Sequence, residues 1–575
     1  MRIDRITVRN FRNLADLDLA LDSGTVIVGE NRAGKSNLLY ALRLVLDSSF
    51  SYSDHQLRKE DFWDGLSDGG DDWDPMADGE IIEVSVEISD FEDDARLLAA
   101  LSDALLEEDP LKARLTYRFA PVDTGEECRS GLRNYQGRVF GGDDEETHIS
   151  RRLRRYLHVQ FLPALRDVES DIKNWRNSPL RGLLEAAASA VAEEDLTDVK
   201  QAMKDANDQL NSLQEIKDLG DSISARLVEM VGENQAIETD LAVAPDDPMR
   251  LIRNMRIFVD GDAHRNLASA SLGTLNVLYL ALLELGLLTR LRDSDIAHVV
   301  MGIEEPEAHL HPHLQRLIFR RLLTTQEDAQ TVLVTTQSPH IVSVADPKSL
   351  VILRTVQGKT HAAAARNADL EEAEWDDIAR YLDATRAELV FARRVLLVEG
   401  FAEQVLVPKL AAARGMDLDK LGISVCAIHG THFSSYVRFC EALAIPWALF
   451  TDGDRVDQHG ISEGNRRAAD LMATLCKNDE PAECGIFVGA TTFEYDLMKD
   501  GPDNILPCIE TLHELCATPS QQTIALWQGR PPDYDDFMKI IANAGGKGRY
   551  AQRLSLRDIQ PPPYVADAID YLAQQ

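Results

Sequence analysis

One eight-residue segment near the start of the chain constrains its fold more than any other feature. Gly29-Glu-Asn-Arg-Ala-Gly-Lys-Ser36 has the spacing G-x-x-x-x-G-K-[ST] and follows the apolar run Thr25-Val-Ile-Val28. The residues from Asn37 to Leu46 then place apolar side chains at helical spacing. A buried strand, a glycine-bounded turn and a helix in this order predict a phosphate-binding loop inside an α/β fold.

The residue types in this segment suit the binding of a nucleotide triphosphate. Glycine lets backbone N–H groups approach the phosphates, and the N-terminus of the following helix adds positive potential. Lys35 is expected to bridge the β- and γ-phosphates, and Ser36 is expected to hold Mg²⁺. We therefore predict that ATP binds here, through Asn31, Gly34, Lys35, Ser36 and Asn37.

Two adjacent acids far downstream complete the predicted nucleotide site. An apolar run that begins at His298 ends in Glu304 and Glu305, and Pro306 follows directly. The end of a strand would present Glu304 to the Mg²⁺ and Glu305 to the attacking water as a general base. A solvated strand terminus is the alternative interpretation, but paired acids after a buried run favour the catalytic one.

Together these motifs resemble the ATP-binding-cassette ATPases of the RecF, SMC and Rad-fifty type. Further segments carry the resemblance: Asn10–Asn13 before the first strands, Ala270–Thr274 at the signature loop, Glu307–Pro312 after the acidic pair and Thr335–Pro339 at the switch segment. It implies that Ser271 and Gly273 of one subunit complete the ATP site of another, and hence a dimer. Gln337 stands where a switch histidine is usual, and Glu304 where many relatives carry Asp, which bears on the rate of ATP hydrolysis.

A second set of acids follows apolar runs in the C-terminal third. Val395–Val398 is followed by Glu399 and Glu403, and Ala448–Phe450 is followed by Asp452 and Asp454. If these runs are parallel strands, their carboxyl ends meet at one edge of a sheet. Clustered carboxylates repel one another and need a divalent cation, and oxygen ligands without cysteine favour Mg²⁺ or Mn²⁺. Two such ions would suit phosphodiester cleavage, with Glu494 as a further ligand and Lys547 stabilising transition-state charge.

This second pattern resembles the Toprim domain, on Glu399-Gly400, Glu403, Gly430 and the Asp-x-Asp of 452–454. An ATPase of this type followed by Toprim resembles the OLD (overcoming lysogenisation defect) family of nucleases, which includes the nuclease subunit of Gabija anti-phage systems. The resemblance implies metal ligands at Glu399, Glu403, Asp452, Asp454 and Glu494, with Lys547 as the catalytic lysine.

The expected fold class is α/β, in two domains. Residues 1–375 would form the ATPase domain, and residues 390–575 a Toprim domain with a Rossmann-like parallel sheet. Apolar residues at helical spacing predict a helical insertion over about 170–240, either a core-facing helix pair or a dimerisation arm, with the arm slightly favoured. The segment 357–374 is polar and alanine-rich, which indicates a linker, and 61–80 indicates a surface loop.

Composition restricts the binding role and the cellular location that can be expected of the chain. The formal net charge is −36, so a general DNA-coating role is excluded and any DNA contact must be local. The chain has 7 cysteines but no Cys-x-x-Cys pair, which favours reduced thiols over a disulfide framework or zinc site. The N-terminus lacks an apolar signal core, and the longest apolar stretch, Leu275–Leu288, is too short to cross a bilayer. A cytoplasmic protein without a membrane segment is expected.

The leading hypothesis is an ATP-binding, divalent-metal-dependent DNA endonuclease or nickase, regulated by nucleotide and acting in anti-phage defence. The alternative is an ATP-gated DNA clamp or repair protein of RecF or SMC type without nuclease activity. The expected partners are DNA and a second copy of the chain, in a homodimer or higher homo-oligomer. Resemblance to Gabija members also implies a UvrD-like helicase partner. The sequence leaves open whether ATP activates or inhibits cleavage.

Overall fold

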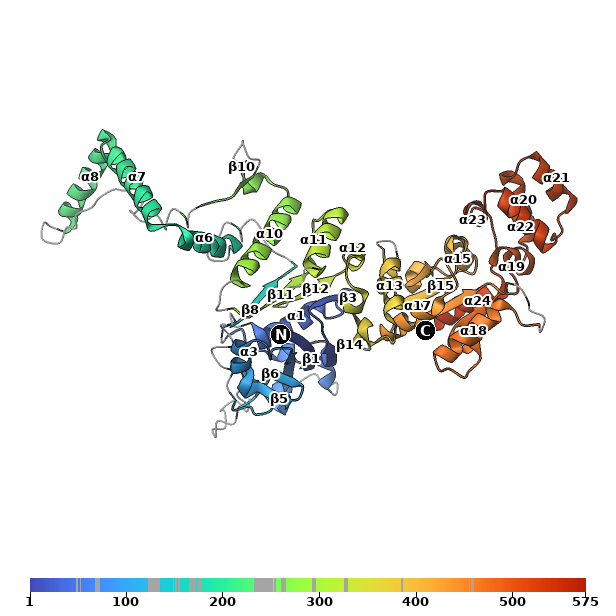
Figure 1. Ribbon diagram of the computed structural model, residues 1–575, viewed down its shortest axis with the longest axis horizontal. Coiled ribbons are helices and arrows are strands. Elements are labelled where there is room, and N and C mark those ends of the chain that lie inside the picture. Colours follow the sequence, from blue (N-terminus) through green and yellow to red (C-terminus); the bar gives the residue numbers. More distant parts are fainter. Residues whose placement is uncertain are drawn as a thin grey trace. The chain divides into compact units, whose positions relative to one another are not determined.

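Figure 1 shows the helices and strands of the computed structural model. The chain divides into two compact units. The first comprises Met1–Leu162, Val300–Glu307 and Pro312–Gln575, and the second Pro163–Val299 and Ala308–His311. The structure describes residues 1–47, 50–51, 53–67, 73–122, 135–147, 149, 153, 156–164, 172, 178–231, 252, 255–259, 265–291, 296–324, 329–383, 386–454, 456 and 460–575.

An antiparallel sheet begins the first unit, in the order β2-β1-β4-β6-β5 with β7 paired to β6. Its alternating apolar residues face the core, as in β1, where Ile6 and Val8 are fully buried. They lie opposite Val86 and Val84 of β4, which fixes the register. The strands are β1 (Arg2–Phe11), β2 (Leu14–Ala20), β4 (Ile82–Ser89), β5 (Leu105–Glu108), β6 (Leu111–Pro121) and β7 (Tyr135–Gly141).

A second sheet carries the predicted nucleotide loop, in the order β14-β13-β3-β12-β11-β8. Its central strand β3 (Gly24–Gly29) is buried along its whole length and runs parallel to both neighbours. Helix α1 (Lys35–Leu46) follows it, which confirms the predicted strand, turn and helix. The other strands are β8 (Leu157–Leu162), β11 (His298–Glu304), β12 (Gln330–Thr336), β13 (Leu350–Val356) and β14 (Lys359–Ala364).

The predicted linker at 357–374 was wrong. β14 pairs antiparallel with β13 inside this sheet, and Ala364 and Ala365 are buried. A 3-10 turn (Ala365–Asn367) and helix α13 (Glu372–Tyr381) follow. Alanines that suggest a flexible linker are here small residues packed in an edge strand and its turn.

The predicted surface loop at 61–80 was wrong in part. Phe62 is 2% exposed and bridges to Phe11 of β1, so this end of the segment belongs to the core. Short helical turns occupy Lys59–Asp61 and Asp64–Leu66, and a short helix, α2, spans Pro75–Asp78. Residues 68–72 lie outside the described part of the chain.

The C-terminal region of the first unit contains a parallel sheet in the order β16-β15-β17-β18. It confirms the predicted strands and, with the sheet around β3, the predicted α/β class. Helices α15 and α24 pack on it, with fully buried Leu396, Leu406 and Ala568 among the core residues. The strands are β15 (Arg394–Val398), β16 (Ile423–Ala427), β17 (Trp447–Thr451) and β18 (Ile486–Val488).

The remaining helices of the first unit lie between and after these strands. They are α3 (Ala95–Leu101), α11 (Pro312–Thr324), α12 (Pro339–Val342), α14 (Glu388–Phe391), α15 (Phe401–Ala413), α16 (Leu418–Leu421), α17 (Phe433–Ala442), α18 (Glu463–Thr474), α19 (Phe493–Asp500), α20 (Ile505–Leu515), α21 (Thr518–Leu526), α22 (Tyr534–Asn543), α23 (Lys547–Leu554) and α24 (Pro563–Gln574). The predicted boundary between 375 and 390 stays a prediction.

The second unit contains the predicted helical insertion, as α6 (Pro179–Ala190), α7 (Glu193–Asn211) and α8 (Gln214–Val231). Apolar side chains on α7 and α8 stay exposed, among them Leu210 at 38% and Leu219 at 51%. Such exposure fits the dimerisation arm better than a core-facing pair, but the dimer stays a prediction. Of the predicted range, residues 170–171, 173–177 and 232–240 lie outside the described residues.

Helix α10 (Leu272–Leu291) is the apolar stretch that the sequence placed at Leu275–Leu288. The helix is longer than that stretch and, by length and composition alone, is apolar enough to cross a membrane. Its buried face includes Leu275, Leu283 and Leu287, and the helix packs against α6. The core helix of a soluble protein passes the same test of length and composition. A short hairpin of β9 (Phe258–Val259) and β10 (Arg265–Asn266) precedes it.

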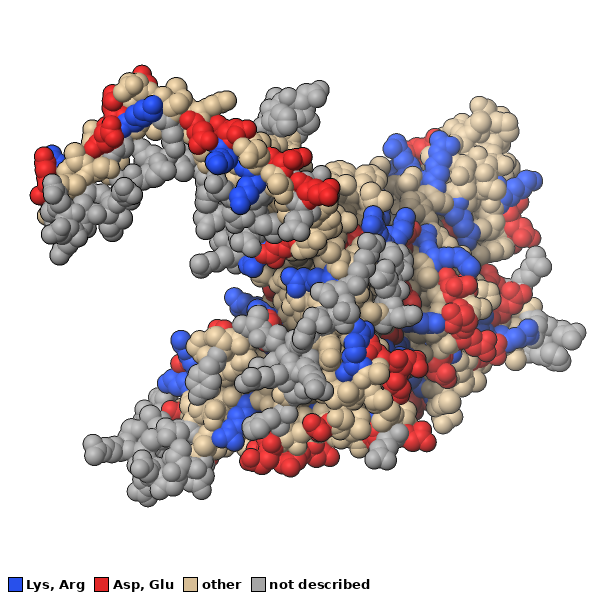
Figure 2. All heavy atoms as spheres, turned by 60° about the vertical axis from the view of Figure 1, so that its left-hand side comes forward, with Lys and Arg blue, Asp and Glu red and all other residues tan. Residues whose placement is uncertain are grey.

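The surface carries charges of both signs. Figure 2 shows acidic side chains gathered in groups on the visible face, with Lys and Arg side chains between them. Basic residues therefore interrupt the excess of acid locally, although the formal net charge of the chain is −36.

The aromatic core beside β17 generates a stability prediction. Phe450 is 1% exposed, stacks on Phe493 and meets Tyr564 edge to face. Phe450→Ala should lower the free energy of unfolding by about 3–5 kcal/mol, because it leaves a cavity. Urea unfolding, with hydrogen exchange of β17 as the local readout, measures this. Leu526→Ala, at a side chain 79% exposed, is the control and should change little; equal effects would contradict the assigned core.

Candidate functional site

Two of the predicted acids meet where neighbouring parallel strands end. Glu399 directly follows β15, and Asp452 directly follows β17. The Oε1 atom of Glu399 accepts a hydrogen bond from the backbone N–H of Asp452 at 2.9 Å and another from the hydroxyl of Thr451. The carboxyl edge of the sheet therefore brings these residues together, as the strand pattern predicted.

Two more acids reach this edge from helices, together with the predicted lysine. Glu403 lies in the first turn of α15 and is 4% exposed, and Glu494 lies in the first turn of α19 and is fully buried. Lys547 begins α23, and its Nζ atom is 2.9 Å from Glu494 Oε2 and 3.8 Å from Asp452 Oδ2. The lysine is thus the counter-charge of two buried carboxylates.

The fifth acid, Asp454, is paired with a residue that the sequence prediction missed. Arg467, on α18, donates from Nη1 to Asp454 Oδ2 at 2.9 Å and from Nη2 to Glu399 Oε1 at 3.3 Å. Its sequence signal is weak, because Arg467 falls one position after Arg466 on a helix whose surroundings are polar. Only the packing of α18 on β18, with Gly464 N–H bonded to the carbonyl of Gly453, assigns it to the acids.

The loop that carries Asp452 and Asp454 is held closely by the segment after β18. The N–H of Gly453 donates to the carbonyl of Thr491 at 2.7 Å, and Phe493 N–H donates to Asp452 Oδ1 at 2.8 Å. A Cβ atom at Gly453 would lie 2.3 Å from the carbonyl oxygen of Gly489. Glycine is therefore required between the two aspartates for the backbones to approach this closely.

A further buried acid, Asp496, has a structural role in the same loop. Its carboxylate accepts the N–H of Ala490 at 2.8 Å and the N–H and hydroxyl of Thr491 at 3.0 and 2.5 Å. These bonds satisfy its oxygens and fix the segment that binds Gly453. Asp496 therefore supports the site by holding this loop.

Burial and like charges disturb the titration of two central acids. Burial, together with the charge of Glu399, raises the pKa of Asp452 to about 9. Burial, together with the charge of Glu494, raises the pKa of Glu403 to about 7. Burial lowers the pKa of Lys547, but the charges of Glu494 and Asp452 outweigh it and raise that pKa above its usual value. All three pKa values are raised because negative charges crowd a buried site, an arrangement that an additional cation would stabilise.

The donor set of this edge fits a divalent cation, although its acids do not converge on a single point. Among the described residues, no three Asp, Glu, His or Cys side chains lie close enough together to hold a metal. In the described part of the chain, however, Oε1 of the fully buried Glu494 has no hydrogen-bond partner, while Oε2 is paired with Lys547. A buried carboxylate oxygen without a partner, beside further carboxylates, suits Mg²⁺ or Mn²⁺.

The predicted phosphate-binding loop is formed as expected. Gly34 has φ of 96°, and a Cβ atom there would lie 2.8 Å from the side-chain amide of Asn13. That amide donates to the carbonyl of Arg32 at 3.1 Å and accepts from Asn37 at 2.6 Å. Asn37 thus braces the loop, and Asn31 lies exposed on its turn.

The charged residues of the nucleotide site also lie together. Lys35 is 5% exposed, and its Nζ atom donates to the carbonyl of Gly29 at 2.7 Å and lies 3.7 Å from Glu305 Oε1. The Ser36 hydroxyl donates to Glu304, and the Gln337 amide donates to Glu305 at 2.5 Å. The predicted Mg²⁺ residues and the predicted base therefore share one site, which fits a nucleotide with its metal.

The predicted signature residues belong to the second unit. Ser271 and Thr274 exchange a hydroxyl hydrogen bond at 2.9 Å at the start of α10. A Cβ atom at Gly273 would lie 2.7 Å from the carbonyl oxygen of His309. Both residues are thus built into a defined turn, and their contact with ATP of another subunit stays a prediction.

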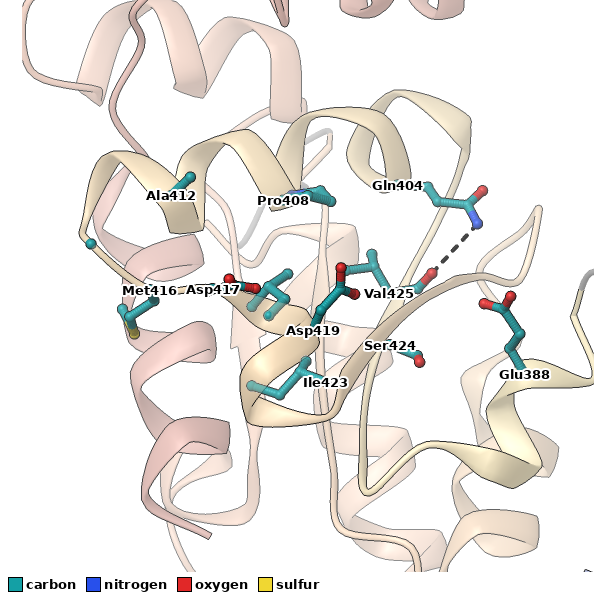
Figure 3. A pocket seen from close by; sticks show the side chains of 12 residues that line it. Glu388, Gln404, Pro408, Ala412, Met416, Asp417, Asp419, Ile423, Ser424 and Val425 are labelled. Carbon is teal, nitrogen blue, oxygen red and sulfur yellow. Dashed lines mark hydrogen bonds between the residues drawn. The ribbon is translucent and has the colours of Figure 1, made fainter. Parts of the chain in front are cut away.

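A separate hollow lies beside the edge strand β16 and contains none of the predicted acids (Figure 3). Its volume is about 500 Å³, and its lining includes Pro408 and Ala412 of α15 and Ser424 of β16. Gln404 donates across it to the carbonyl of Val425 at 3.4 Å. Glu403 and Gln404 are neighbours on α15, so one face of this helix carries an acid of the sheet edge and an adjacent face lines the hollow.

Comparison with known families agrees with this geometry. Residues 390–454 match the family described as "Overcoming lysogenization defect protein-like, TOPRIM domain". Residues 25–343 match a family described as an AAA domain, whose description also names the AbiEii toxin and Type IV TA systems.

Relatives of similar length have been described. The chain is 25% identical over 480 residues to the OLD nuclease of Thermus scotoductus, and this alignment covers 81% of this chain and 85% of the nuclease. It is 23% identical over 472 residues to the endonuclease GajA of Bacillus cereus, and this alignment covers 80% of this chain and 76% of GajA. The solved C-terminal region of the Burkholderia pseudomallei OLD protein is 31% identical, with a TM-score of 0.30, over 32% of this chain and 98% of that one.

The raised pKa values generate a prediction for the metal-free protein. Below about pH 4 a carboxyl is protonated in both folded and unfolded chains. As pH rises toward about 9, unfolded chains lose the proton that folded Asp452 keeps, so stability must fall. With a chelator present, the melting temperature should therefore fall between pH 5 and 9, and by less in Asp452→Asn. Thermal unfolding across pH measures this, and Asp500→Asn, on the exposed end of α19, is the control.

Added Mg²⁺ should reverse that loss of stability at high pH, because a bound cation replaces the proton as the partner of the ionised acid. An Asp452→Asn protein with the same pH profile as the wild type would show that Asp452 is not the group responsible.

Proposed function

Because the chain belongs to the AAA domain family and carries an OLD-like Toprim domain, we propose that it is a nucleotide-regulated, metal-dependent DNA endonuclease or nickase of the OLD family. The single observation that carries the proposal is the cluster of acids at the carboxyl edge of the parallel sheet. Glu399 and Asp452 meet there through a direct hydrogen bond, and Lys547 lies beside Asp452 and Glu494.

The residues at this edge divide the work of phosphodiester cleavage. Glu399, Glu403, Asp452, Asp454 and Glu494 would hold Mg²⁺ or Mn²⁺. The metal, when bound, supplies an activated water and stabilises the leaving oxygen. Lys547, kept protonated by Glu494 and Asp452, can donate to a phosphate oxygen where negative charge develops. Because Glu494 is fully buried, its ion pair holds the ammonium group of Lys547 in a fixed position.

Nucleotide regulation is supported by a contact between the phosphate-binding loop and the start of β15. Glu30, directly after Gly29, accepts two bonds from Arg393 at 2.6 and 3.0 Å. Arg354, on β13, donates to the carbonyl of Ala392 at 2.7 Å. Lys35 donates to the carbonyl of Glu30 at 3.2 Å and would turn to phosphate when ATP binds. A conformational change in this loop can thus be transmitted to β15, the strand directly before Glu399.

The partners follow from the same assignment. DNA is the substrate, and a homodimer or higher homo-oligomer would place Ser271 and Gly273 against the ATP of another subunit. A UvrD-like helicase partner and a role in anti-phage defence complete the proposal. The competing function, an ATP-gated DNA clamp without cleavage, requires the acids to be inert, and cleavage by variants of these acids decides between the two.

Removal of the acids should abolish cleavage. Glu399→Ala and Asp452→Ala should each lower plasmid nicking or cutting by at least roughly a hundredfold, since even outer-shell partners of a metal are worth about 10–100-fold. The assay uses purified protein, supercoiled plasmid and Mg²⁺ or Mn²⁺.

Asp419→Asn, at an exposed acid of α16 beside the separate hollow, is the matched control and should cut normally. Undiminished cleavage in both alanine variants would place the nuclease centre elsewhere. Tight ATP-dependent DNA binding without cleavage in any divalent metal would favour the clamp.

Lys35→Ala should remove the response of cleavage to ATP, whether that response is activation or inhibition. The reason is that Lys35 is the cation of the phosphate-binding loop and would lose its charge contact to the phosphates. Cleavage measured across ATP concentrations gives both the sign of regulation in the wild type and its loss in the variant. Lys59→Ala, at an exposed lysine of the same unit, should respond as the wild type does. A persistent response in Lys35→Ala would place the regulatory nucleotide elsewhere.

A further inference from the structure

We infer that Arg467 is a positioning residue of the metal site, which holds the carboxylates of Glu399 and Asp454 so that their remaining oxygens can receive a divalent cation. The inference rests on the proposed function and adds to it a residue of α18, outside the acids and the lysine. Its basis is the set of hydrogen bonds that one guanidinium makes at the carboxyl edge of the sheet.

The planar fork of Arg467 spans two acids from different strands. Nη1 donates to Asp454 Oδ2 at 2.9 Å, and Nη2 lies 3.3 Å from Glu399 Oε1. A guanidinium presents its donors in a fixed plane, so it sets the orientation of both carboxylates as well as their charge. A lysine ammonium, as a point charge, does not reproduce this.

The guanidinium is also anchored by neutral groups. Nη2 donates to the carbonyl of Asp452 at 2.6 Å and to the hydroxyl of Thr451 at 2.9 Å, and Nε donates to the same hydroxyl at 3.2 Å. These contacts do not depend on the charge of the acids. Arg467 therefore keeps its place when a cation takes up that charge, which distinguishes it from a stand-in that a metal would displace.

Each acid keeps one oxygen for another partner. Arg467 uses Oε1 of Glu399 and Oδ2 of Asp454, and no described residue donates to Oε2 of Glu399 or to Oδ1 of Asp454. The hydroxyl of Thr451 and the N–H of Asp452 also select Oε1. Within the described residues, the bonding thus engages one oxygen of each carboxylate and leaves the other for a further ligand.

Arg467 also restrains the backbone conformation of Asp454. Asp454 has φ of 55°, in the left-handed region that only a minority of non-glycine residues adopt. The ion pair with Arg467 ties the side chain of this residue to α18. Without that contact the loop after Gly453 would lose the restraint that aims Asp454 at the other acids.

The test is metal affinity. Mn²⁺ binding by the full-length protein, measured by electron paramagnetic resonance, should be about 10–100-fold weaker in Arg467→Gln. The Mn²⁺ concentration for half-maximal plasmid cleavage should rise correspondingly, while the rate at saturating Mn²⁺ is largely retained. Arg467→Lys should recover little of the affinity, because it restores the charge without the fork. Arg466→Gln, an exposed arginine on the same helix, removes the same charge and should bind Mn²⁺ as the wild type does.

Several results would overturn the inference. Mn²⁺ binding that is unchanged in Arg467→Gln would show no positioning role, and tighter binding would show that the guanidinium competes with the metal. A lower cleavage rate with an unchanged half-maximal Mn²⁺ concentration would indicate only a folding defect, which thermal unfolding in chelator would register. Full recovery by Arg467→Lys would reduce the role to charge alone. Absence of Mn²⁺ binding by the wild type would instead overturn the proposed function, and the inference with it.

Discussion

The C-terminal half of the molecule depends on the placement of several negative charges at one edge of a parallel sheet. Burial of a carboxylate is costly unless a cation or hydrogen-bond donors compensate it. Here Lys547 compensates Glu494 and Asp452, and Arg467 compensates Glu399 and Asp454. The compensation is incomplete, because Oε1 of the buried Glu494 has no partner among the described residues and the pKa of Asp452 is raised. Such a surplus of buried negative charge suits a further cation.

The two chemical centres of the chain follow one structural rule. In each, a buried strand is followed by polar or acidic residues, and a helix begins close to them. At the nucleotide site β3 leads into the glycine loop and α1, and β11 leads to Glu304 and Glu305. At the candidate metal site β15 and β17 lead to Glu399 and Asp452. Parallel strands deliver side chains from distant parts of the sequence to one edge, which is why both sites combine residues so far apart.

Sequence reasoning succeeded where a local pattern and its chemistry coincide. Continuous apolar runs predicted the strand before Gly29 and the strands before Glu399 and Asp452, and helical spacing predicted the insertion that forms α6, α7 and α8. It failed at 357–374, where alanines indicated a linker and the chain instead forms β14. Small residues packed at a sheet edge and small residues in a flexible linker have the same composition. Only pairing with β13 separates them, and pairing is not a local property.

What the sequence determined by itself was the inventory of chemistry: a phosphate-binding loop, paired acids after strands, and the order of two α/β regions. What only the tertiary structure decided was which cations neutralise which acids. Arg466 and Arg467 are adjacent in sequence and identical in type, yet Arg466 is exposed and Arg467 binds Glu399 and Asp454. The difference arises from the rotation of α18 on β18, the strand against which this helix packs. A side chain's direction on a helix depends on what the helix packs against, and the sequence specifies that packing only through the whole fold.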